Sequence, residues 1–131
     1  MKEKIKILIA NSHEIYRNAL EMALSKTPNV EVCFTTSDIK NINTFDNIDI
    51  LLSDINSPVN SSIENLKNIT EKYPGIKIIA LSMSQGNEYL KDSLNNIGIK
   101  NLLQQSADRE ELNNAINAVY NGNNYISRNL I

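Results

Sequence analysis

Five polar residues stand at or just after the ends of four short apolar runs, where a parallel sheet would gather them at one edge. They are Asn11, Ser12, Asp54, Ser82 and Gln105. In doubly wound sheets the working site lies past the carboxyl ends of the strands, at the topological switch point. Asp54 is the one charged member of the set, so the available chemistry is that of a single carboxylate among neutral hydroxyl and amide groups.

Each of these side chains also has a structural interpretation. Asp54 could simply accept hydrogen bonds from the loop after its strand. Ser12 is predicted to be the N-cap of the first helix, and Asn11 is expected to bond the neighbouring backbone. The Ser82 hydroxyl could bond backbone or keep a functional role. The Gln105 amide could bond Asp54, bond another loop or face water, and the sequence does not choose.

The elements that must position these residues alternate between β-rich runs and amphipathic stretches. Helical spacing places Ile15, Ala19, Met22 and Ala23 on the inner face of a first helix. Cys33 is expected to be a small core residue of the second strand. Strands are predicted over residues 5–10, 30–34, 48–53, 76–81 and 101–104, helices over about 58–73, 87–97 and 108–121, and a weak helix in the polar segment that ends at Asn47.

Three further helix patterns are specific enough to test. Asp108 and Glu111 have capping-box spacing at the start of the last helix. The predicted inner faces carry Ile63, Leu66, Ile69 and Tyr73; Leu90, Leu94 and Ile97; and Leu112, Ala115, Ile116 and Val119. Strands flanked by helices on both sides predict an α/β fold with a three-layer, doubly wound parallel sheet.

Composition limits the function classes. A chain of 131 residues suits one domain. A net charge of −2 without basic clusters gives no footprint for nucleic acid or membrane. No leader or membrane-spanning run is evident, and a single cysteine forms no internal disulfide, so a cytoplasmic location is expected. The sequence has no phosphate-cradling glycine loop and no Ser-His-Asp or Cys-His constellation. These absences disfavour a flavodoxin-like enzyme or a nucleotide-binding protein, and we expect no enzyme activity.

Nearly the whole chain resembles the receiver domain of bacterial response regulators, especially the subfamily joined to a LuxR-type helix-turn-helix. The segments that carry the resemblance are ILIANSHEIYRNALEMAL, DILLSDINSP, IIALSM and GIKNLLQQSADREEL, in the family's order and spacing. The resemblance implies a five-stranded sheet of order 2-1-3-4-5. It also places the phosphoacceptor aspartate on Asp54, the loop proline on Pro58 and the hydroxyl switch residue on Ser82.

The departures from the family pattern concern its charges. The two metal-binding acids fall on Asn11 and Ser12, the lysine falls on Gln105, and the aromatic switch residue of the fifth strand falls on Leu102. Val59 and Ser62 replace glycines of the phosphorylated loop. His13 is common in the subfamily, so a structural role is favoured over pH sensing or phosphoryl relay. We therefore expect Mg²⁺ binding to be lost or weak, with no other cofactor.

The resemblance implies a receiver domain over residues 1–124, with 125–131 beginning a linker or C-terminal tail. It implies the regulatory part of a two-component transcription regulator whose attached domain binds DNA, poorly or not phosphorylated here. Expected partners are a second copy of the chain, an attached or separate output domain and a sensor histidine kinase. A receiver that is phosphorylated on Asp54 and a stand-alone interaction module are the alternatives.

Overall fold

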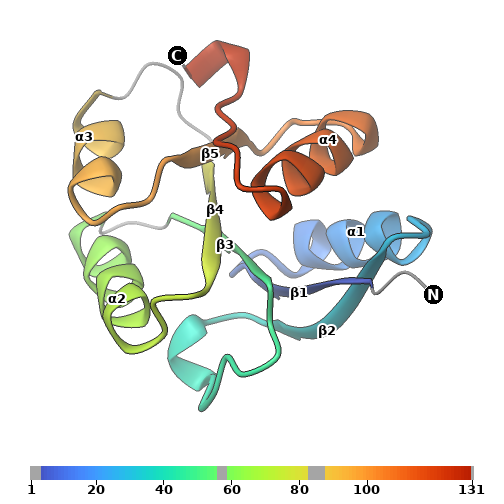
Figure 1. The fold of residues 1–131 in the computed structure, drawn as a ribbon, viewed down its shortest axis with the longest axis horizontal. Coiled ribbons are helices and arrows are strands. Elements are labelled where there is room, and N and C mark those ends of the chain that lie inside the picture. The colour runs from blue at the N-terminus through green and yellow to red at the C-terminus, as the bar shows by residue number, and fades with distance from the viewer. Residues whose placement is uncertain (1–3, 56–58, 83–87, 131) are drawn as a thin grey trace.

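The chain forms one five-stranded parallel sheet between two layers of helices (Figure 1). The structure, a computed structural model, describes residues 4–55, 59–82 and 88–130. The strand order is β2-β1-β3-β4-β5, as the sequence predicts. Helices α1 and α4 cover one face of the sheet, and α2 and α3 cover the other. Among the described residues, no helix is long and apolar enough to cross a membrane.

The strands agree with the sequence prediction to within about two residues at each end. The three central strands are almost wholly buried, which explains why they are continuous apolar runs. The strands are β1 (Ile5–Ala10), β2 (Val30–Thr36), β3 (Ile50–Asp54), β4 (Lys77–Ser82) and β5 (Asn101–Gln104).

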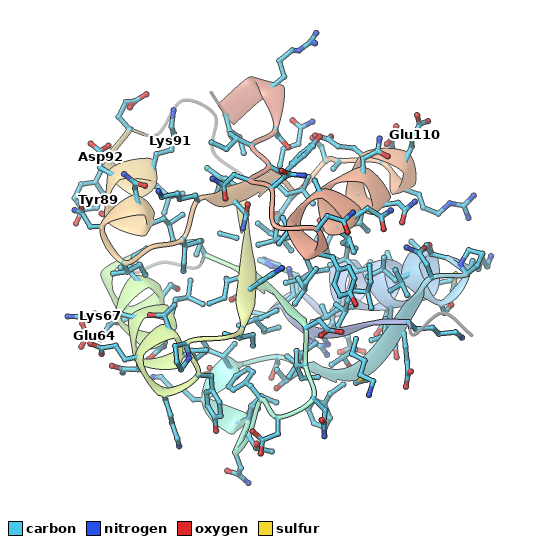
Figure 2. All side chains as sticks on the ribbon, in the orientation of Figure 1. Glu64, Lys67, Tyr89, Lys91, Asp92 and Glu110 are labelled. Carbon is cyan, nitrogen blue, oxygen red and sulfur yellow. The ribbon has the colours of Figure 1, made fainter. Side chains whose placement is uncertain are left out.

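The later helices bury the faces that their periodicity predicts. Leu66, Leu90, Leu94 and Ile116 are buried, while charged residues such as Glu64, Lys67 and Asp92 point away from the sheet (Figure 2). Gly98 and Gly122 follow the last two helices with positive φ angles, which a residue with a side chain adopts at a cost. The helices are α1 (Glu14–Ser25), α2 (Val59–Lys72), α3 (Glu88–Asn96) and α4 (Arg109–Tyr120). Pro58 and Asn87 lie outside the described residues.

The predicted inner face of α1 is wrong. Ile15 is 88% exposed and Met22 is 61% exposed, whereas Leu20 and Leu24 are in the core. The stripe at Ile15, Ala19 and Met22 has helical spacing, but the stripe at Leu20 and Leu24 is the one that contacts the sheet. Because both stripes are apolar, periodicity alone does not distinguish the inner face from the outer one.

The predicted burial of Cys33 is also wrong. Ile7 pairs with Val32 while Leu8 pairs with Phe34, so Cys33 is the extra residue of a β-bulge in the edge strand β2. The bulge breaks the alternation of faces, and both Cys33 and Phe34 are exposed.

A short 3-10 turn replaces the weak helix predicted before Asn47. The turn η1 spans Ile39–Asn41, and the Asp38 side chain caps it by accepting a hydrogen bond from the Lys40 N–H at 2.9 Å. The connection from β2 to β3 otherwise lacks regular structure up to residue 49. Phe45 in this connection is nevertheless buried in the part of the core that lies between the sheet and helices α2 and α3. Asp38 and Lys40 are thereby held near the carboxyl ends of the strands.

Only half of the predicted capping box forms at α4. The Asp108 carboxylate accepts the Glu111 N–H at 2.8 Å, as expected. The Glu111 carboxylate does not bond back to the N-cap. It accepts hydrogen bonds from Gln104 Nε2 at 3.1 Å and from the Tyr125 and Ser127 hydroxyls, both at 2.8 Å.

The segment after α4 packs against β5. The Leu102 N–H donates to the Tyr125 carbonyl at 2.9 Å, and the Ser127 N–H donates to the Leu102 carbonyl at 2.8 Å. The Gln104 N–H donates to the Ser127 hydroxyl, and Ser127 and Leu130 are buried. Residues 125–130 are therefore packed on the edge of the sheet.

Candidate functional site

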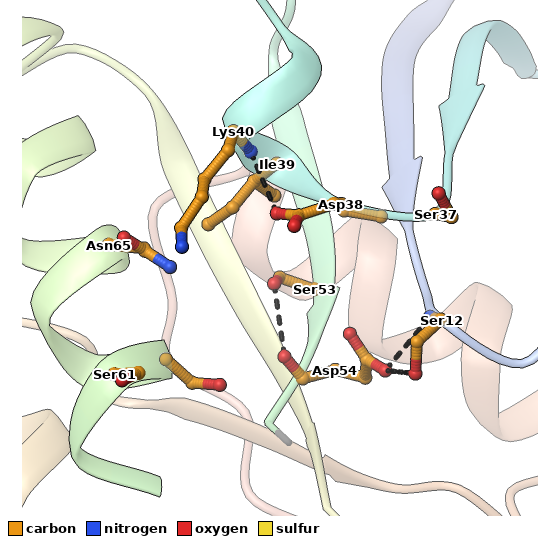
Figure 3. Close-up of a pocket in the computed structure, with 11 residues that line it drawn as sticks. Ser12, Ser37, Asp38, Ile39, Lys40, Ser53, Asp54, Ser61 and Asn65 are labelled. Atoms are coloured by element: carbon orange, nitrogen blue, oxygen red, sulfur yellow. Dashed lines mark hydrogen bonds between the residues drawn. The ribbon is translucent and has the colours of Figure 1, made fainter. Parts of the chain in front are cut away.

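The carboxyl ends of β1, β3, β4 and β5 meet at one edge of the sheet and bring the predicted site residues together. Asp54 ends β3 next to the β1–α1 loop and is only 8% exposed. Its Oδ2 atom accepts two hydrogen bonds from Ser12, one from the N–H and one from the hydroxyl, both at 3.1 Å. The Ser53 hydroxyl donates to the Asp54 carbonyl at 3.2 Å. The β1–α1 loop therefore hydrogen-bonds this carboxylate (Figure 3). Residues 56–58 of the loop after β3, from which the sequence suggested these hydrogen bonds, lie outside the described residues.

Ser12 is not the N-cap that the sequence predicts. His13 is at the N-cap position of α1 and makes no side-chain cap hydrogen bond. The Ser12 hydroxyl bonds Asp54 instead, because the chain crosses the end of β3 one residue before the helix begins. His13 is exposed, and its ring Nδ1 lies 3.5 Å from the Ser12 hydroxyl.

Asn11 bonds the neighbouring backbone as expected. Its Oδ1 atom accepts the His13 N–H at 2.8 Å, and its own N–H donates to the Thr36 carbonyl at 3.0 Å. The residue is fully buried, and within the described part of the chain its Nδ2 atom has no hydrogen-bond partner. Arg17 fixes the same turn through a 2.7 Å hydrogen bond to the Asn11 carbonyl.

Ser82 and Gln105 lie side by side on the opposite flank of Asp54. The Gln105 N–H donates to the Ser82 carbonyl at 3.0 Å, which extends the β4–β5 pairing by one residue. Ser82 is buried and Gln105 is half-buried. Among the described residues, no hydrogen bond joins the Gln105 amide to Asp54, so this one of the three alternatives that the sequence left open is not formed.

Sequence analysis missed two residues that order the site. Besides Arg17, Tyr16 connects α1 to the β5–α4 loop, because its hydroxyl donates to the Gln105 carbonyl at 2.9 Å. Burial, with a smaller contribution from the Asp54 charge, raises the pKa of Tyr16 to about 12. The hydroxyl is therefore a neutral donor at ordinary pH. Tyr16 was not predicted as a site residue, since helical position alone does not identify a partner 89 residues away.

A polar pocket of about 190 Å³ opens beside Asp54 between β1, β3, η1 and the first turns of α2. Lys40 extends from η1 toward Asn65 of α2, on the far side of the pocket from Ser12 (Figure 3). Apart from Ala10 and Ile39, the described residues that line it are polar: Ser12, Ser37, Asp38, Lys40, Ser53, Asp54, Ser61, Ser62 and Asn65. Lys40 is the one cationic residue among these described lining residues.

The residues around Asp54 do not form a multi-acid metal centre. Within the described residues, no group of three or more histidine, cysteine, aspartate or glutamate side chains is placed to hold a metal ion. The two residues that follow β1 supply an amide and a hydroxyl, which are weaker ligands than carboxylates for a hard divalent cation.

Comparisons with known proteins agree with this geometry. The chain is 31% identical over 128 residues to the oxygen regulatory protein NreC of Staphylococcus carnosus, covering 93% of this chain and 58% of NreC. It is 28% identical over 129 residues to the transcriptional regulatory protein DegU of Brevibacillus brevis, covering 95% of this chain and 54% of DegU. The chain thus spans a little over half the length of these relatives.

The fold is also that of a solved receiver structure. The isolated REC domain of RcsB from Salmonella enterica serovar Typhimurium, in the presence of the phosphomimetic BeF3-, superposes with a TM-score of 0.82 at 21% identity. The match covers 98% of this chain and 96% of that domain. Residues 7–117 match the response regulator receiver domain family. The chain therefore belongs to that family, and its strand order and the position of Asp54 at the end of a strand agree with this.

Proposed function

We propose that this chain is an atypical receiver domain whose output does not depend on phosphorylation of Asp54. The observation that carries the proposal is the neutral character of the groups around this carboxylate. Asn11, Ser12 and Gln105 occupy the positions of two acids and a lysine, and Ser12 donates two hydrogen bonds to Asp54.

Phosphoryl transfer to a carboxylate brings two anions together, so it needs positive charge at the site. A receiver of the usual kind uses Mg²⁺, held by carboxylates, and a lysine. Here one carboxylate remains of three, and the lysine position is an uncharged amide. Removing one charged group from such a charge-neutralising cluster costs about 2–5 kcal/mol of interaction free energy. Three groups of the cluster differ here from those of the usual receiver. The residues present do not fit a tightly held Mg²⁺.

The direct test is incubation with a small phosphodonor and Mg²⁺, followed by intact-mass measurement. We expect no addition of a phosphoryl group, and the same spectrum for wild type and Asp54→Asn. Labelling of the wild type that Asp54→Asn abolishes would instead establish the alternative, a receiver phosphorylated on Asp54.

Magnesium binding is the second prediction. With an amide and a hydroxyl after β1, amide chemical shifts at residues 10–13 and at Asp54 should not saturate at millimolar Mg²⁺. An NMR titration measures this, with Ca²⁺ as a comparison for nonspecific charge effects. Saturation confined to these residues would contradict the prediction.

A receiver whose output does not depend on phosphorylation needs an interaction surface that forms without a phosphoryl group, and helices α1 and α4 offer one. They lie side by side on one face of the sheet (Figure 1). On these two helices Leu20 is in the core, Tyr16 and Ala118 are half-buried and Tyr120 is 38% exposed. The exposed apolar side chains of α1 are instead Ile15 and Met22. Because they lie seven residues apart, which is about two helical turns, they share a face.

The third prediction is a constitutive homodimer through α1 and α4. Sedimentation should show a dimer at micromolar concentration with and without beryllofluoride, since no phosphoryl input is needed. Met22→Glu should weaken the dimer at least about tenfold by placing a charge in an apolar contact. Phe34→Glu is the matched control, because Phe34 is an exposed apolar residue of β2 away from α1 and α4. Its register partner Leu8 faces the side of the sheet that α2 and α3 cover. A monomer, or a dimer only with beryllofluoride, would contradict the prediction.

The output is proposed to be transcription control through a LuxR-type DNA-binding domain. The support is the relatives' length, since they extend well beyond this chain, and the name of DegU, a transcriptional regulatory protein. Measuring promoter activity in cells with the gene deleted, and with the wild-type gene restored, tests this output. We expect the deletion to change expression and the restored gene to reverse the change.

A further inference from the structure

The pocket beside Asp54 lies at the switch point of the sheet, between β1 and β3, where doubly wound folds bind ligands. Its volume of about 190 Å³ equals the liquid volume of roughly six water molecules. It is smaller than the pockets of drug-sized ligands, which begin at about 300 Å³. The pocket therefore has room for a small metabolite.

The lining of the pocket depends on the short connection between β2 and β3. Because η1 is a single 3-10 turn capped by Asp38, it holds Lys40 next to the strand ends. The Lys40 side chain then reaches across toward Asn65 (Figure 3). No ion pair of the Lys40 ammonium and no hydrogen bond of the Asn65 amide is formed with another described residue, so both groups are available to a ligand.

The charges of the lining select the kind of ligand. Two carboxylates, Asp38 and Asp54, and one ammonium, Lys40, face the same small space. A phosphate dianion would meet two like charges and a divalent cation would meet the ammonium, and neither repulsion is well screened in a confined site. A molecule with one positive and one negative group meets a complementary charge for each.

We propose that this pocket binds a small zwitterion of the α-amino-acid class. The ligand ammonium lies toward Asp54 and Asp38, and its carboxylate lies toward Lys40, Asn65 and the Ser61 hydroxyl. The proposal rests on the proposed function and deepens it, because it names an input that takes the place of phosphorylation. Such a ligand bridges η1 and α2, so it favours whichever arrangement of these two elements closes on it.

The test is an NMR titration of the domain with four separate probes: glycine, L-alanine, L-serine and L-glutamine. At least one should bind with a dissociation constant of about 1 mM or tighter and shift residues 38–40, 53–54 and 61–65. Acetate and ethylamine, which each carry one of the two charges, should bind at least about tenfold more weakly. Lys40→Gln and Asp54→Asn should each weaken binding about tenfold or more, while thermal unfolding shows that both variants fold. Lys26→Gln, at the opposite end of α1, is the matched control and should bind as wild type does.

The proposal is overturned if none of the four amino acids binds, if Lys40→Gln binds as tightly as wild type, or if inorganic phosphate binds as well as the amino acids. The titration uses unmodified protein and no phosphodonor. Labelling of Asp54 by a phosphodonor would therefore overturn the proposed function separately, without deciding whether the pocket binds an amino acid.

Discussion

The triple variant Asn11→Asp, Ser12→Asp, Gln105→Lys is expected to bind Mg²⁺ and to accept a phosphoryl group on Asp54. The backbone around the site already has the strand-end geometry of the family, so the missing parts are charges. Three carboxylates would supply hard oxygen ligands, and the lysine would offset the charge that develops during transfer. We expect intact mass to change from no labelling to labelling of most of the protein.

Two controls make this result specific. Adding Asp54→Asn to the triple variant should abolish labelling, and the triple variant without metal should be less stable than wild type because its carboxylates repel one another. Raising Mg²⁺ should recover that stability, as a shift in the unfolding midpoint. A folded triple variant that takes no phosphoryl group would show that the carry-over of site residues from the family is wrong at this site.

Glu111→Ala is expected to destabilise the domain by about 3 kcal/mol and to lower the melting temperature by roughly 10 °C. The Glu111 carboxylate accepts three hydrogen bonds, from Gln104, Tyr125 and Ser127. A hydrogen bond to a charged group contributes about 1.5–3 kcal/mol net of competing bonds to water, and the half-buried position of Glu111 places the combined effect toward the lower end. Loss of the carboxylate leaves the buried Ser127 hydroxyl without this acceptor. Thermal unfolding followed by circular dichroism measures the effect.

Glu110→Ala is the matched control, because Glu110 has the same charge in the same first turn of α4. It points into solvent (Figure 2), so its substitution should cost less than about 1 kcal/mol. A similar loss from both variants would assign the effect to the charge at the helix terminus and not to the hydrogen bonds with the C-terminal segment.

The contribution of Glu111 to the free energy of unfolding should decrease as the pH falls. Partial burial acts to raise the pKa of Glu111, but the hydrogen bonds from Gln104, Ser127 and Tyr125 outweigh it and lower the pKa below its ordinary value. A lowered pKa means that the stabilisation is complete above the ordinary glutamate pKa and is lost as the pH falls through the folded-state value. The difference in stability between wild type and Glu111→Ala should therefore shrink on acidification.

Buried strands and the inner faces of α2, α3 and α4 could be predicted because apolar runs and helical spacing directly reflect burial on a sheet. The face of α1 could not, since Ile15 and Met22 are as apolar as Leu20 and Leu24 and only contact with the sheet separates them. Cys33 was misplaced because a bulge depends on the register with a neighbouring strand, which a single strand's sequence does not record.

At the site, the positions of Asn11, Asp54 and Ser82 followed from the rule for strand ends, and Asn11 bonds the neighbouring backbone as predicted. The hydrogen bonds between Ser12 and Asp54 did not follow from that rule. Ser12 bonds Asp54, 42 residues away, instead of capping the helix that follows it. Lys40 lines the pocket because the segment between β2 and β3 forms a three-residue 3-10 turn in place of the predicted helix. Both outcomes depend on long-range geometry. Local propensity describes what a residue can do with its neighbours and not which distant group competes for its hydrogen bond.

The C-terminal segment also bears on how the sheet avoids associating with other sheets. An open edge strand offers unpaired N–H and C=O groups to another chain and favours aggregation. At β5, both groups of Leu102 and the N–H of Gln104 are taken up by Tyr125 and Ser127. At the other edge, the bulge at Cys33 makes β2 irregular, which disfavours extension of the sheet by a flat strand. Removing residues 125–130 should therefore expose a β5 edge able to pair with a second molecule.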